Sequence, residues 1–73
     1  MFHERLLLVR KLQRRTQKEV ADSISVSERN YQLYEYGKSK PSFKNLIALA
    51  DYFNISLDFL VERTDDPILH KIN

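Results

Sequence analysis

Residues 16–37 read TQKEVADSISVSERNYQLYEYG and predict two short helices joined by a tight turn. Thr16 is followed three residues later by Glu19, which is the spacing of a capping box. In this motif the hydroxyl and the carboxylate each satisfy a backbone N–H that would otherwise lack a partner at a helix start. A helix is therefore expected from about Gln17. One face of that helix collects the apolar residues Val20, Ala21 and Ile24, which are expected to turn inward.

A second helix is predicted after the turn, over residues 28–36. Ser27 can cap its start, and Gly37 suits the left-handed residue that often follows a helix end. Tyr31 and Tyr34 stand three residues apart and are expected to be buried. Together the two segments form a predicted helix-turn-helix unit.

Burial of the two tyrosines turns a polar face of the second helix outward. Arg can pair bidentately with guanine and Gln with adenine, Glu can accept from cytosine, and Leu can lie against a thymine methyl group. A solvated helix face is the competing explanation, and this stretch alone does not separate the two. The outward residues are Glu28, Arg29, Gln32 and Leu33.

Length and composition restrict the class of protein. Seventy-three residues predict one small domain, without room for a separate catalytic or small-molecule effector domain. The sequence contains no cysteine, which excludes a disulfide framework and a thiolate metal site. With no signal peptide and no apolar run near the roughly 18 residues of a membrane span, the chain is expected to be soluble and cytoplasmic. No cofactor and no membrane partner are expected.

Charge is distributed unevenly along the chain. Residues 1–44 hold ten Lys or Arg against five Asp or Glu, whereas residues 45–73 hold two against five. The basic half contains the helix pair. A basic face on a small domain is the electrostatic pattern of a nucleic-acid binder, although domains with other functions also carry such an excess.

Three further helices are expected, over about residues 2–13, over residues 43–53 after Ser42, and in a short segment after Ser56. No segment alternates with period two, so the fold class is all-α. In the first helix, Leu7, Leu8 and Leu12 either widen the core contact or form a surface patch. The domain is expected to span residues 1–62, with residues 63–73 a short extension that forms one helical turn near Asp66 or frays.

These features resemble the XRE or lambda-repressor-like helix-turn-helix domains of bacterial and phage regulators. The resemblance covers roughly residues 2–61. Its motifs are Leu6, Val9 and Arg10, Thr16-Gln17 with Ala21, Val26-Ser27, Tyr34-Glu35 before Gly37, Lys40-Pro41-Ser42, and LIALADYFNISLDFL over residues 46–60. The resemblance implies five helices, a two-fold dimer on double-stranded operator DNA, and the third helix in the major groove.

The resemblance also implies roles for individual residues. Base contacts are expected from Gln17, Glu28, Arg29, Asn30, Gln32 and Leu33. Phosphate contacts are expected from Arg14, Thr16, Ser27, Tyr36, Lys38, Ser39, Lys40 and Lys44. Arg10 and Glu35 are expected to form a buried ion pair. The homodimer is expected to form through residues 54–61 and their neighbours, with Tyr52, Phe59 and Val61 as exposed apolar candidates and the leucine-rich first helix as the alternative.

The sequence departs from the family pattern at three places. Arg14-Arg15 stands where Gly-Leu is common, so Leu12 or the stem of Arg15 is expected to fill the space of the missing leucine. Ser25 stands where the turn often has Gly, which predicts a strained backbone. Tyr36 replaces the usual Asn or Arg before Gly37, and its hydroxyl can still donate to phosphate.

An enzyme is the first competing class, but His3 and His70 are isolated and no nucleophile, phosphate-loop or metal motif is present. A protein-interaction module of the same fold, without DNA binding, is the second. The sequence predicts a non-enzymatic, sequence-specific DNA-binding regulator that acts as a repressor, and the antitoxin of a toxin pair is the alternative role.

Overall fold

The computed structural model describes residues 2–62, and these residues form five helices. The helices are α1 (Phe2–Leu12), α2 (Gln17–Ser23), α3 (Glu28–Glu35), α4 (Phe43–Phe53) and α5 (Leu57–Leu60). No strand occurs within this part of the chain, so the all-α prediction is confirmed. The predicted extension over residues 63–73 lies outside the described residues.

Side-chain caps start the last four helices, as predicted. At α2, Thr16 Oγ1 accepts from the Glu19 N–H at 3.0 Å, and the Glu19 carboxylate accepts from the Thr16 N–H at 2.8 Å. The remaining three helices are capped by the hydroxyls of Ser27, Ser42 and Ser56, each accepting from the backbone N–H three residues on. An N-cap of this kind stabilises a helix by about 1 kcal/mol, so the capping residues in the local sequence determine where the short helices begin.

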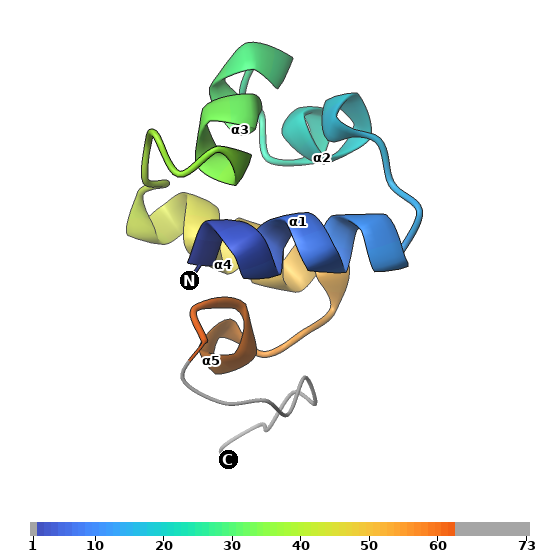
Figure 1. The fold of residues 1–73 in the computed structure, drawn as a ribbon, viewed down its shortest axis with the longest axis vertical. Coiled ribbons are helices and arrows are strands. Elements are labelled where there is room, and N and C mark those ends of the chain that lie inside the picture. The colour runs from blue at the N-terminus through green and yellow to red at the C-terminus, as the bar shows by residue number, and fades with distance from the viewer. Residues whose placement is uncertain (1, 63–73) are drawn as a thin grey trace.

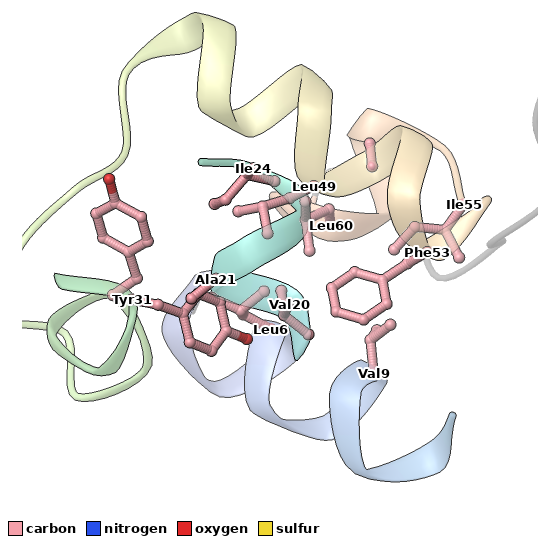
Figure 2. Close-up of a cluster of buried hydrophobic side chains, with 12 residues drawn as sticks. Leu6, Val9, Val20, Ala21, Ile24, Tyr31, Leu49, Phe53, Ile55 and Leu60 are labelled. Atoms are coloured by element: carbon pink, nitrogen blue, oxygen red, sulfur yellow. The ribbon is translucent and has the colours of Figure 1, made fainter. Parts of the chain in front are cut away.

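One apolar core receives side chains from all five helices (Figure 2). Leu6 of α1, Val20 and Ala21 of α2, and Leu49 of α4 are fully buried. Phe53 and Leu60 close the core from the ends of α4 and α5. The predicted inward face of α2 is therefore confirmed. On α4, Leu49, Ala50 and Phe53 are buried as predicted, while Leu46 is only half-buried.

The helix-turn-helix pair lies at one end of the molecule (Figure 1). Helices α2 and α3 contact each other closely, and α3 also packs against α1. Helix α5 lies on the opposite side of the domain, where it contacts α1 and α4. Because α1 contacts both α3 and α5, it joins the two ends of the fold.

The extra leucines of α1 are divided between the interior and the surface. Leu7 is half-buried, whereas Leu8 is 50% and Leu12 is 72% exposed, so the latter two form a surface patch. The expectation that Leu12 fills the space of the missing leucine is wrong. Arg15 is also exposed, and its guanidinium lies 5.9 Å from the centre of the Tyr52 ring. A groove of about 510 Å³ remains, lined by Val9, Leu12, Gln13, Phe53, Asn54, Ile55 and Phe59.

Both positions where glycine is common in the family have a left-handed backbone. Arg14 has φ 56° and Ser25 has φ 60°, so each residue adopts a conformation that favours glycine. The strain predicted at Ser25 is confirmed, and Arg14 carries the same kind of strain. Gly37 has φ 74°, as expected of a residue that follows a helix end.

Replacing Arg14 with glycine should raise the free energy of unfolding by about 0.5–1 kcal/mol. A left-handed conformation costs a residue with a Cβ about 1–2 kcal/mol, and glycine's greater freedom in the unfolded chain offsets part of that gain. Urea denaturation measures the change. Arg15→Gly removes the same charge one position on, where φ is not positive, and should be destabilising. Equal effects of the two substitutions would contradict strain at Arg14.

Candidate nucleic-acid interface

The outward face of α3 carries the side chains predicted to read bases. Glu28 and Arg29 are exposed, while Asn30, Gln32 and Leu33 are half-buried. Tyr31 and Tyr34 are buried, as predicted, with their rings edge to face at a centroid distance of 6.3 Å. Within residues 2–62, Arg29 forms no ion pair.

A buried carboxylate lies at the end of the same helix. Glu35 is 4% exposed, and Arg10 of α1 donates to both of its oxygens, with Nε 2.5 Å from Oε2 and Nη2 3.0 Å from Oε1. The predicted Arg10–Glu35 ion pair is therefore present. The Tyr31 hydroxyl donates to Oε2 at 2.5 Å, and Gln17 Nε2 donates to Oε1 at 3.0 Å. Glu35 thus connects α1, α2 and α3.

The network extends from the buried carboxylate to the outward face of α3. Gln32 Nε2 donates to Gln17 Oε1 at 3.0 Å. Both polar atoms of the Gln17 amide are therefore bonded within the protein, one to Glu35 and one to Gln32. Gln17 and Gln32 were predicted as separate base contacts, and the bond between them was not predicted. The bond between Tyr31 and Glu35 could have been predicted from the sequence, because residues four apart on one helix are neighbours.

The network changes the protonation equilibria of its members. Burial on its own raises the pKa of the Glu35 carboxyl, but hydrogen bonds from Arg10, Tyr31 and Gln17 outweigh it and hold that pKa below its usual value. Burial, followed by the hydrogen bond to Glu35, raises the pKa of the Tyr31 hydroxyl. The bond to Glu35 also raises the pKa of the Arg10 guanidinium. The ionised pair is the form that the fold stabilises.

Acid should destabilise this protein partly through Glu35. Its folded pKa lies below its unfolded value of about 4.3, so at acid pH the unfolded chain binds the additional proton. The stabilisation by Glu35 is complete above that unfolded pKa and is lost as pH falls through the folded one. Urea titrations at pH 6 and pH 3 should show a smaller loss for Glu35→Gln than for the unsubstituted protein. Equal losses would show that another group, such as the Glu19 capping carboxylate, carries the effect.

The predicted phosphate contacts lie before, between and after the helices of the helix-turn-helix pair in the sequence. All are exposed except Ser39, which is half-buried. The set comprises Arg14, Thr16 and Ser27 before or between the helices of the pair, Tyr36, Lys38, Ser39 and Lys40 after α3, and Lys44 in the first turn of α4. The hydroxyl oxygens of Thr16 and Ser27 act as acceptors in their caps, and a hydroxyl that accepts can still donate its proton.

These features define an all-helical helix-turn-helix domain with a polar, cation-flanked recognition face. A family model described as helix-turn-helix matches residues 6–60. The chain belongs to that family, and the resemblance to lambda-repressor-like domains is confirmed.

Relatives and solved structures agree with this assignment. The chain is 42% identical over 60 residues to the cryptic phage CTXphi transcriptional repressor RstR of Vibrio cholerae, covering 82% of this chain and 54% of that protein. It is 33% identical over 67 residues to the uncharacterized HTH-type transcriptional regulator YobD of Bacillus subtilis, covering 92% of this chain and 60% of the relative. The chain therefore spans little more than half the length of these relatives.

Two structures of the P22 c2 repressor share the fold. Its DNA-binding domain in solution superposes with a TM-score of 0.79 at 26% identity, covering 84% of this chain and 80% of that one. The P22 c2 repressor in complex with a synthetic operator gives a TM-score of 0.77 at 27% identity, covering 82% and 91%. None of the helices formed by residues 2–62 is long and apolar enough to cross a membrane.

Proposed function

We propose that this protein is a cytoplasmic transcriptional repressor that binds operator DNA as a homodimer, with α3 in the major groove. The observation that carries the proposal is the polar outward face of α3, with exposed cations before α2, in the loop after α3 and at the start of α4. The family assignment supports it, as does the likeness to a repressor whose structure contains a synthetic operator. Base edges would be read by α3, while the flanking residues hold the DNA backbone.

The reading residues would act by their chemistry. Glu28 and Arg29 stand in the first turn of α3, the part of a recognition helix that contacts base edges. Arg29 suits guanine, and Glu28 suits the exposed amino group of cytosine. Asn30, Gln32 and Leu33 complete the proposed reading surface. The Gln17 amide lies behind it, because its two polar atoms are bonded to Glu35 and Gln32.

The phosphate contacts would set the position of the duplex. Lys38, Ser39 and Lys40 form the loop after α3, and Arg14 and Thr16 precede α2. Arg14 adopts a strained backbone conformation, so its substitution by glycine is expected to stabilise the fold while removing a cation from this surface. Loss of one phosphate contact should reduce the slope of the logarithm of the binding constant against the logarithm of the salt concentration by about one.

The dimer would form at the end of the domain opposite α3. Tyr52, Phe59 and Val61 are half-buried rather than fully exposed as expected, and Tyr52 and Phe59 pack against the core. The guanidinium of Arg5 lies 4.3 Å from the centre of the Phe59 ring. The groove of about 510 Å³ is lined by Phe59 and also by the exposed Leu12. The two candidate dimer surfaces, residues 54–61 and α1, therefore adjoin at this groove.

Phe59→Glu is expected to weaken the dimer about tenfold, which corresponds to about 1.4 kcal/mol, because it places a charge beside an apolar groove. Sedimentation at several protein concentrations measures the change, and circular dichroism shows whether the variant is folded. Phe43→Glu is the matched control, since Phe43 is 69% exposed on α4 and does not line the groove. A folded Phe59→Glu variant with unchanged dimerisation would remove this surface from the interface.

Selection of bound duplexes from a random pool tests the function itself. The protein should enrich a two-fold symmetric sequence whose half-sites lie about one duplex turn apart. If the recovered duplexes share no common sequence, or if no duplex is recovered, the proposal is overturned. That result would favour a protein-interaction role for the same fold.

A further inference from the structure

The Glu35 network ends at a side chain on the proposed reading surface, and this gives the buried carboxylate a second role. We propose that Glu35 and Gln17 are positioning residues that fix which polar atoms Gln32 presents to a base, and that Gln32 thereby selects adenine. The inference rests on the proposed function, because it requires α3 to enter the major groove.

The first step is the orientation of Gln17. Ionised carboxylates accept hydrogen bonds and cannot donate them, so the amide group that faces Glu35 Oε1 has to be the NH2 of Gln17. Glu35 itself is held by Arg10 and by the Tyr31 hydroxyl, and it is buried. The Gln17 amide is therefore anchored with its nitrogen inward and its oxygen free to accept elsewhere.

The second step carries that orientation to Gln32. Since Gln17 Oε1 can only accept, the Gln32 atom that meets it at 3.0 Å has to be Nε2. If the Gln32 amide were turned over, two oxygens would face each other and the bond would be lost. The chain of bonds thus sets the direction of the Gln32 amide before any DNA is bound.

The third step is what remains available on Gln32. One N–H is used by Gln17, which leaves one N–H donor and the Oε1 acceptor. A donor beside an acceptor matches the N7 and N6 atoms of adenine in the major groove. An amide that rotates freely could equally offer its atoms in the reverse order, so the fixed direction is what supplies discrimination.

Two substitutions that remove different bonds to Glu35 separate positioning from stability. Methionine has a side chain of similar length to glutamine, and Gln17→Met removes both the bond to Glu35 Oε1 and the bond to Gln32. Tyr31→Phe removes the bond to Oε2 and leaves the path from Glu35 to Gln32 intact. Tyr31 is fully buried and is not part of the DNA surface. Both variants should be less stable, but only Gln17→Met should alter base choice.

Selection from a random duplex pool, followed by competition binding to single-base variants of the recovered operator, measures base choice at each position. The unsubstituted protein should prefer adenine at one position of each half-site by roughly 5- to 150-fold. Gln32→Met and Gln17→Met should each reduce that preference to less than about threefold, at the same position, and the double variant should lose no more than either single one. Tyr31→Phe should keep it.

The alternatives give different results. If Gln17→Met keeps the preference that Gln32→Met removes, Gln17 does not position Gln32 and the inference fails. A uniform loss of affinity on all duplexes for Gln17→Met would make Gln17 a phosphate contact. A preference for a base other than adenine would refute the proposed orientation of the Gln32 amide. If the unsubstituted protein enriches no sequence from the pool, the proposed function itself is refuted.

The free protein supplies a second readout. In nuclear magnetic resonance spectra, the side-chain amide protons of Gln32 should exchange more slowly than those of an exposed amide, and Gln17→Met should abolish that protection. Loss of protection without a change in base choice would show that the bond exists but does not contribute to reading, which also overturns the inference.

Discussion

Glu35→Ala is expected to lower the free energy of unfolding by about 3–5 kcal/mol, because it removes one partner of a buried ion pair. The Arg10 guanidinium donates to both carboxylate oxygens, and the Tyr31 hydroxyl and the Gln17 amide donate to them as well. Removal of the carboxylate leaves these donors without their acceptor in a site that water does not readily reach. The cost therefore arises mainly from the unpaired groups that remain.

Urea denaturation at neutral pH and low salt measures this change. Asp22→Ala is the control, because Asp22 pairs with Lys18 at 3.4 Å and both side chains are largely exposed, at 64% and 70%. Exposed pairs of this kind contribute about 0.3–0.5 kcal/mol. A loss below about 1 kcal/mol for Glu35→Ala would place the Arg10–Glu35 pair in the same class as exposed pairs and refute its structural role.

Arg29→Ala should weaken binding to the preferred operator by about 1–3 kcal/mol and relax the choice of base at one position. Arg29 is exposed in the first turn of α3 and forms no ion pair within residues 2–62. Little change is expected on random DNA, because a base contact contributes only where the matching base is present. Lys40→Ala removes a cation from the loop after α3 and should weaken both kinds of DNA alike, with a salt slope reduced by about one.

Competition binding with operator and random duplexes at several salt concentrations separates the two residues. The comparison is matched, since each substitution removes one positive charge from an exposed side chain. Equal losses on both DNAs for Arg29→Ala would assign it to the phosphate backbone, and the reading role would then pass to Glu28, Gln32 and Leu33.

The local sequence was sufficient to predict the helices and the residues at which they begin. Thr16, Ser27, Ser42 and Ser56 each precede a helix, and each cap bonds a residue only three positions on, so its effect does not depend on the remainder of the fold. The apolar spacing on α2 correctly identified its buried face for a similar reason, since helix geometry converts spacing into direction. The Arg10–Glu35 pair came from the family resemblance.

Only the tertiary structure established how polar groups from different helices combine. Gln17 and Gln32 lie 15 residues apart and Gln17 and Glu35 lie 18 apart, so no helical periodicity relates them. Their bonds arise because α2 packs against α3. Packing also left Leu12 on the surface beside a groove instead of filling the space of the missing leucine. A sequence pattern states which residues prefer burial, but the shape left between packed helices determines which of them achieve it.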